Sequence, residues 1–267
     1  MDTAAAVEFD LHVHTTASDG TLTVDELPAA ARQAGVGTVA VTDHDRVHPE
    51  LDAPVTTRDG VRVVRGIELR VDAGDMRVDL LGYGVDPGRD LAAELDRLQR
   101  NRVERARTIV DCIEAETGVE LDIEPAEGVG RPHIARAVAA SAAPYDYEGA
   151  FEHLIGNDCE CYVARELPTF ERGAGLLRES CAVVSLAHPF RYPDVDRALD
   201  LARDLDAVER YYAYGRPVDD ARVEAVATDA GLLRTGGSDA HDRTLGRAGL
   251  AGDEARAFRE RLESGRT

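Results

Sequence analysis

Five short segments of this chain place histidine or carboxylate side chains at the end of an apolar run. In chain order they are residues 10–20 (DLHVHTTASDG), 42–45 (TDHD), 66–68 (GIE), 186–189 (LAHP) and 237–241 (GSDAH). Residues two apart in a strand point to the same side of the sheet, so His12 and His14 can face one cavity, as can Asp239 and His241. A single His-x-His pair more often marks a half-exposed strand than a metal site. The five segments together supply more ligands than one ion needs, in a mixture that suits zinc, manganese and iron, and they predict a centre with several metal ions.

Strand and helix patterns alternate on both sides of a long helical segment. Strands are expected at residues 7–14, 37–42, 61–71, 78–84, 182–186, 207–212 and 231–235, and helices at 23–34, 196–204 and 219–230. The candidate ligands follow the carboxyl ends of these strands, where parallel α/β barrels place their active sites. We therefore expect an α/β fold built on a parallel, barrel-like sheet.

The middle of the chain has a different composition. Residues 90–116 form one long helical pattern, and the segment that follows, to about residue 165, has shorter helices and no convincing strand. We predict that residues 1–86 and 167–267 build the barrel. Residues 87–166 are predicted to form a helical insertion that caps the metal face.

The long helix contains two arginines on its apolar stripe. Continuing the three- and four-residue spacing of that stripe leads to Arg102 and Arg105, and the apolar members are Leu91, Leu95, Leu98, Ile109 and Ile113. Two guanidinium groups on a buried face are costly unless they meet anions. They could reach solvent or pair with carboxylates of this acidic chain, or they could clamp a phosphate, whose oxygens match the guanidinium fork. Arg131 and His133 open a later helix, where backbone N–H groups also favour an anion.

The charge balance limits the substrate. The chain has 51 acidic against 31 basic residues, a formal net charge of -20, and every one of those basic residues is arginine. Such a surface is similar to that of proteins from salt-loving cells, where salt screens the self-repulsion. It would repel nucleic acid at low salt. We expect a small phosphorylated substrate and no duplex nucleic acid.

The cysteines and the apolar runs indicate in which cellular compartment the protein is expected. Cys112, Cys159, Cys161 and Cys181 form no Cys-x-x-Cys pair, and we expect four reduced thiols. The first motif begins too early to leave room for a signal peptide, and no apolar run approaches transmembrane length. These features predict a cytoplasmic protein that does not bind membranes.

The ordered motifs DLHVHTTASDG, TDHD, GIE, AHP and GSDAH resemble those of the PHP (polymerase and histidinol phosphatase) superfamily of metal-dependent phosphoesterases. The similarity is greatest to the branch of 3′,5′-nucleoside bisphosphate phosphatases and 5′-to-3′ exoribonucleases of short RNA. That branch shares the helical insertion, the paired arginines and the GRPHIAR segment at residues 130–136. The resemblance implies a distorted (β/α)7 barrel that holds two or three divalent ions, with manganese favoured and zinc or iron as alternatives.

The resemblance also implies a ligand set. One ion would be held by His12, His14, Glu68 and Asp239, a second would share Glu68 and use His188, and a third would take Asp19, His44 and His241. The family usually has a further histidine eleven residues after the bridging glutamate, where this chain has Asp79, and we expect Asp79 to complete the second site as a harder, anionic ligand. Glu68, Asp239 and His188 are the predicted catalytic residues.

The leading hypothesis is hydrolysis of a phosphate ester of a small nucleotide, either a 3′,5′-nucleoside bisphosphate or the 5′ end of a short RNA. The nucleophile would be a metal-bound hydroxide, because a metal lowers the pKa of water from about 15.7 to about 7. A second anionic group of the substrate would be held by Arg102, Arg105, Arg131 and His133. The alternatives are a histidinol-phosphatase-like or other small-molecule phosphatase, a metal-dependent amidohydrolase, and a non-catalytic metal-binding regulatory domain.

Overall fold

The computed structural model describes residues 6–265, which form two compact units. The first unit combines the chain up to Ala92 with the chain from Pro168, and the second comprises residues 93–167. Each unit is described by itself. The capping of the metal face by the helical insertion stays a prediction.

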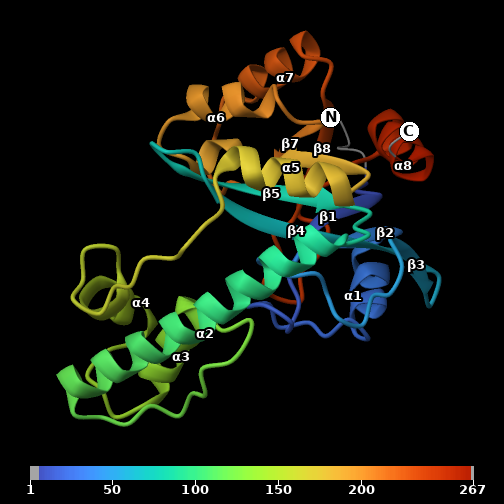
Figure 1. Cartoon of the computed structure of the whole chain (residues 1–267). Coiled ribbons are helices and arrows are strands. Elements are labelled where there is room, and N and C mark those ends of the chain that lie inside the picture. The colour runs from blue at the N-terminus through green and yellow to red at the C-terminus, as the bar shows by residue number, and fades with distance from the viewer. Residues whose placement is uncertain (1–5, 266–267) are drawn as a thin grey trace. The chain divides into compact units, whose positions relative to one another are not determined.

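The first unit is built around an eight-stranded sheet (Figure 1). The sheet order is β1-β2-β4-β5-β6-β7-β8, and β3 pairs with β4 off this path. An isolated bridge between Val13 and Ala240 joins the two ends of the order, so the sheet is nearly closed. The predicted α/β barrel is therefore confirmed. The strands are β1 (Phe9–Val13), β2 (Thr38–Val41), β3 (Val55–Arg58), β4 (Val61–Asp72), β5 (Arg77–Tyr83), β6 (Val183–Leu186), β7 (Ala207–Tyr212) and β8 (Leu233–Gly237).

Two strands depart from the expected parallel arrangement, and the first is β3, which runs antiparallel to β4. β5 runs antiparallel to both β4 and β6. The connection from β4 to β5 is a short turn around Gly74, whose φ is 89°. A parallel pair needs a crossover of about a dozen residues or more, so this turn enforces a hairpin and distorts the barrel.

Helices of the first unit pack against the strands. α5 contacts β4, β5 and β6, while α6, α7 and α8 contact β6, β7 and β8 respectively. The helices are α1 (Leu27–Ala34), α5 (Phe170–Ser180), α6 (Val195–Ala202), α7 (Asp220–Asp229) and α8 (Gly252–Ser264), with a short 3-10 turn η2 (Pro189–Arg191). α1 begins later than the predicted residue 23, because Thr23 and Glu26 form a reciprocal hydrogen-bonded turn before it.

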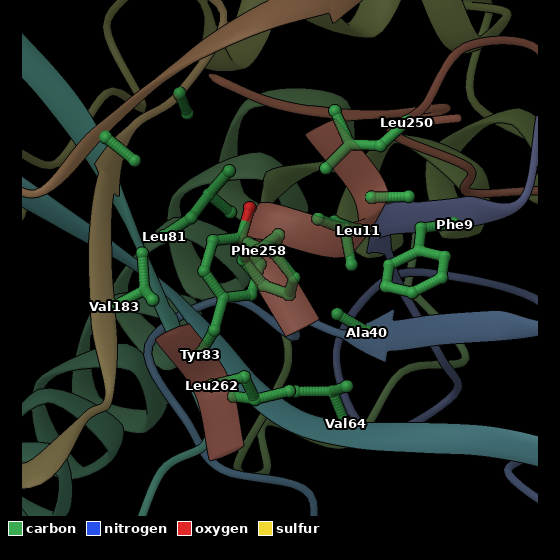
Figure 2. Close-up of a cluster of buried hydrophobic side chains, with 13 residues drawn as sticks. Phe9, Leu11, Ala40, Val64, Leu81, Tyr83, Val183, Leu250, Phe258 and Leu262 are labelled. Carbon is green, nitrogen blue, oxygen red and sulfur yellow. The ribbon is translucent and has the colours of Figure 1, made fainter. Parts of the chain in front are cut away.

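One apolar cluster joins α8 to the inside of the barrel (Figure 2). The ring of Phe258 meets Phe9 edge-on at 6.4 Å between centroids and Tyr83 edge-on at 5.2 Å. All three side chains are almost completely buried. Burying a ring of this size contributes about 1.5–3 kcal/mol, so the cluster anchors the start of β1, three residues before His12.

The second unit is helical. It contains most of α2 (Arg89–Thr117), then α3 (Arg131–Ala140), α4 (Tyr147–Ala150) and the π-helical turn η1 (Phe151–Ile155). Its core includes Ile109, Ile113, Ile134, Val138 and Ile155.

A disulfide joins Cys112 of α2 to Cys161, with a sequence separation of 49 residues. The expectation of four reduced thiols is thus wrong for this pair, while Cys159 and Cys181 are free. In the chain-entropy model a loop of this length stabilises the folded state by about 4 kcal/mol. No helix among the described residues is long and apolar enough to cross a membrane.

Candidate metal centre

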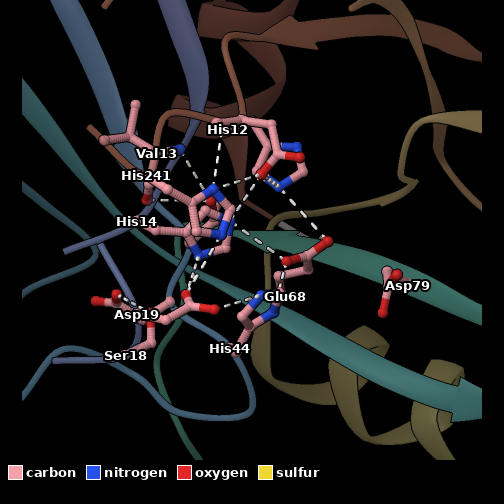
Figure 3. Close-up of polar contacts among 12 residues, drawn as sticks. His12, Val13, His14, Ser18, Asp19, His44, Glu68, Asp79 and His241 are labelled. Carbon is pink, nitrogen blue, oxygen red and sulfur yellow. Dashed lines mark hydrogen bonds and ion pairs between the residues drawn. The ribbon is translucent and has the colours of Figure 1, made fainter. Parts of the chain in front are cut away.

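Side chains from all five sequence motifs converge in the first unit (Figure 3). They form three overlapping groups, and within each group the donor atoms lie within 4.8 Å of one another. The groups are His14, Asp19, His44 and His241; His12, His14 and Asp239; and His12, Glu68 and His188. Shared members make this one continuous centre.

The backbone around these ligands is tightly constrained. A Cβ atom at Gly237 would lie 2.3 Å from the amide nitrogen of His12, so β1 and β8 approach closely only because residue 237 is glycine. His188 and Asp239 both adopt positive φ values, 27° and 47°. Such strain in non-glycine residues clusters at functional sites.

Glu68 lies in the middle of the centre. Its Oε1 is 3.5 Å from His12 Nε2 and 3.1 Å from His188 Nε2. Its Oε2 is 3.4 Å from His14 Nε2 and 2.7 Å from His44 Nδ1. Each carboxylate oxygen therefore faces two imidazoles, which is the placement a bridging ligand needs.

The donor atoms fit divalent cations. His12 Nε2 and His14 Nε2 are buried and face carboxylate oxygens at 3.1–3.5 Å, but neither makes a hydrogen bond of good geometry among the described residues. A buried polar atom without a partner is costly, and a bound ion is one of the few explanations for several together. Imidazole and carboxylate donors match manganese, zinc and iron.

The electrostatics keep the carboxylates ionised. Burial would raise the pKa of Glu68, but His44 and His12 hold that pKa well below its usual range. Burial likewise would lower the pKa of His12, but Glu209, Asp239 and Glu68 raise it well above its usual range. A pocket with this excess of negative charge attracts cations.

Two carboxylates of the motifs support the loops rather than the centre. Asp10 accepts hydrogen bonds from Ser238 N and Oγ at 2.8 and 2.6 Å. Asp43 accepts from Thr15 N and Ser18 Oγ, also at 2.8 and 2.6 Å. These bonds hold the segments that carry His14, Asp19 and Asp239 in place.

Glu209 of β7 contacts two candidate ligands, His12 and His188, and the sequence analysis did not predict this role. One oxygen lies 3.0 Å from His12 Nδ1, and the other accepts a hydrogen bond from the His188 amide at 2.7 Å. The residue is fully buried. The sequence signal that could have identified Glu209 is a charged residue at a position expected to be buried in a predicted strand. Carboxylates that hold the far nitrogen of a ligating histidine orient the ring and raise its basicity.

We expect Glu209→Gln to weaken metal binding by about ten- to a hundredfold, because the neutral amide removes the charge that polarises His12. Titration of metal-stripped protein with Mn²⁺ by calorimetry measures this. Glu260→Gln, at an exposed position of α8, is the matched control and should leave affinity unchanged. Equal affinities for wild type and Glu209→Gln would contradict the positioning role.

Asp79 lies apart from the three groups. Both of its oxygens are 2.9 Å from the guanidinium of Arg70, its partner across the β4–β5 ladder. Its Oδ2 is 3.8 Å from His188 Nε2. As a ligand, Asp79 would have to share an oxygen between Arg70 and a cation, so its predicted role as a ligand stays a prediction.

The predicted substrate residues occur together in the second unit. Arg105 donates through Nε to the carbonyl of Val163 at 2.6 Å. Burial, together with the neighbouring charges of Arg165, Arg131 and Arg102, lowers the pKa of Arg105 to about 9. Like charges held this close favour an anion between them.

The start of α3 adds to this arginine cluster. Arg131 donates to the Ile155 carbonyl at 3.0 Å and lies over the Tyr162 ring. His133 Nδ1 accepts from the Gly130 amide at 3.1 Å, which orients the imidazole at the helix start. Arg165 was missed from the sequence, because it lies outside any helical stripe.

A comparison with models of protein families shows to which family the chain belongs. The model of the PHP domain matches residues 10–155, more than half of the chain. The chain belongs to the PHP family. This confirms the resemblance drawn from the five motifs.

Curated proteins that are similar in sequence to this chain have the names of phosphoesterases. The chain is 30% identical over 247 residues to a 3′,5′-nucleoside bisphosphate phosphatase of Chromobacterium violaceum, covering 87% of this chain and 86% of the relative. It is 31% identical to a phosphoribosyl 1,2-cyclic phosphate 1,2-diphosphodiesterase of Eggerthella lenta, covering 88% and 94%. It is 27% identical to the 5′-3′ exoribonuclease Rnm of Escherichia coli, covering 90% and 87%. The chain is a PHP-family phosphoesterase.

Solved structures share the fold. A Bifidobacterium adolescentis protein, provisionally described as a metal-dependent phosphoesterase, matches with a TM-score of 0.79 at 25% identity over 96% of both chains. An amidohydrolase from Chromobacterium violaceum, solved with sulfate and no metal, matches with a TM-score of 0.75 at 24% identity, covering 95% and 96%.

Proposed function

We propose that this protein hydrolyses a phosphate ester of a small nucleotide, either a 3′,5′-nucleoside bisphosphate or the 5′ end of a short RNA. The observation that carries the proposal is the centre in which both oxygens of Glu68 face pairs of histidines. The names of the relatives from Chromobacterium violaceum and Escherichia coli support a nucleotide or RNA substrate.

Divalent ions would be held by His12, His14, Asp19, His44, Glu68, His188, Asp239 and His241. When bound, they would supply Lewis-acid stabilisation of the phosphoryl oxygens and a water acidic enough to attack near neutral pH. Glu68, in the middle of the centre, would help to hold more than one ion. Glu209 would orient the imidazole ring of His12. Asp239 would be oriented by the two hydrogen bonds that its Oδ2 oxygen accepts.

The arginine cluster supplies the recognition of a second anion. Arg102, Arg105, Arg131 and His133 would bind a phosphate of the substrate that is not hydrolysed. Bidentate guanidinium contacts suit this role, because they fix direction as well as charge. A phosphatase of simple monoesters has no use for such a cluster.

A turnover screen in Mn²⁺ tests the proposal. The substrates are adenosine 3′,5′-bisphosphate, a 5′-phosphorylated trinucleotide RNA and histidinol phosphate, with phosphate or nucleotide release as the readout. We expect turnover of one or both nucleotide substrates, abolished by metal stripping and restored by Mn²⁺. Preference for histidinol phosphate would overturn the nucleotide assignment. Turnover unaffected by metal stripping would overturn the metal chemistry.

A further inference from the structure

A pocket of about 340 Å³ opens on the first unit beside the metal centre. It lies between the turn η2, which directly follows His188, and the chain that leaves the end of β7. Its walls are Phe190, Arg191, Tyr212, Ala213, Tyr214 and Arg216. Three aromatic rings and two guanidinium groups thus surround one small cavity.

The pocket touches the metal centre through one carboxylate. The Tyr212 hydroxyl and Arg191 Nη1 both donate to Oδ2 of Asp239, at 2.7 and 2.9 Å. The other oxygen, Oδ1, lies 3.4 Å from His12 Nε2 and 3.1 Å from His14 Nε2. A molecule whose phosphate lies at the metals would have its next chemical group within reach of this pocket.

The aromatic walls are held in place before any ligand binds. Tyr214 and Tyr212 have ring centroids 4.6 Å apart, and Tyr214 meets Phe190 edge-on at 5.4 Å. The Tyr214 hydroxyl accepts a hydrogen bond from the Phe190 amide at 3.3 Å, and Arg216 donates to the Phe190 carbonyl at 2.9 Å. Preorganised rings lose little entropy when a flat ligand stacks on them.

We propose that this pocket binds the nucleobase of the substrate by stacking on Tyr214 and Tyr212. Every nucleobase has a π-face that stacks on aromatic side chains, and guanidinium groups add contacts to the same flat surface. The inference rests on the proposed function and deepens it. A base-binding pocket would favour a nucleotide over a phosphoribosyl compound that has no base. A compound of the second type is named as the substrate of the relative from Eggerthella lenta.

The test compares two substrates that differ only in the base, adenosine 3′,5′-bisphosphate and ribose 3,5-bisphosphate. The wild-type enzyme should prefer the adenosine compound in kcat/KM, and Tyr214→Leu should reduce that preference roughly ten- to a hundredfold. Tyr214→Phe keeps the ring and should retain the preference. Tyr211→Leu is the matched control, because Tyr211 lines a different pocket and should leave the preference unchanged.

A binding measurement keeps the inference testable if neither bisphosphate is hydrolysed. Calorimetry of metal-stripped protein with adenosine 5′-monophosphate and with ribose 5-phosphate should show tighter binding of the first, and Tyr214→Leu should remove the difference. Equal loss on both ligands or both substrates would overturn the inference, since it would mean that the pocket binds phosphate or sugar. No effect of Tyr214→Leu on either ligand would overturn it as well.

Discussion

Glu68→Gln is expected to reduce turnover on the order of a thousandfold or more while the protein stays folded. The amide replaces one carboxylate oxygen by an N–H donor and removes the negative charge from the middle of the centre. Four histidines face the two oxygens of Glu68 within 3.5 Å. Ions held at this centre would lose their central anionic ligand, and the Lewis-acid chemistry that they would supply would weaken with it.

Two measurements accompany the rate. Metal analysis after dialysis should show fewer ions per chain in Glu68→Gln, and circular dichroism should show an unchanged fold. Glu260→Gln, exposed on α8, controls for the loss of one carboxylate from this acidic chain. Wild-type turnover in Glu68→Gln with a reduced metal content would exclude the metal chemistry proposed for this centre.

The convergence of the candidate ligands could be foreseen because most of them obey local rules. His12 and His14 are two apart at the end of a strand, and Asp239 and His241 follow the last one. Parallel strands of a barrel bring their carboxyl ends to one face, so such residues meet without any knowledge of the packing. Seven of the eight candidate ligands that meet in three groups came from motifs of this kind, whereas Glu68 lies inside β4.

The supporting contacts could not be foreseen in the same way. Glu209 contacts His12, which lies 197 positions away in the sequence. No sequence pattern around Glu209 indicates which residue it contacts. Asp79 was assigned from the resemblance, which says nothing of Arg70 opposite it in the ladder. Cys112 and Cys161 come together only when the second unit folds.

Some elements of the fold were also missed, although two had a local signal. α8 buries Ala255, Phe258 and Leu262, a spacing of three and four residues that predicts a helix. α5 begins after Thr169, whose side chain accepts from the Arg172 amide as an N-cap. The short strand β3 is half-exposed and has no apolar alternation, so its pairing with β4 decides its conformation.

The double variant Arg102→Ala/Arg105→Ala should reduce kcat/KM for adenosine 3′,5′-bisphosphate by about 10²- to 10⁴-fold. Each charge-assisted bidentate contact contributes about 1.5–3 kcal/mol. Arg102 and Arg105 interact with each other, so the upper end of the expected loss in kcat/KM is the additive limit. Both arginines are buried, and burial together with the charges of neighbouring arginines lowers the pKa of Arg105 to about 9. Each single variant should lose about ten- to a hundredfold.

The comparison that decides the role of these arginines uses a substrate without a second phosphate. Hydrolysis of p-nitrophenyl phosphate should change little in the double variant, because the metal centre belongs to the first unit and both arginines belong to the second. Arg107→Ala on the same helix is the matched control, since that side chain is exposed. Equal losses on both substrates would show that the arginines maintain the second unit, for which the Arg105 bond to Val163 offers a structural reason. A selective loss on the bisphosphate would instead establish an anion site built from an otherwise apolar helical stripe.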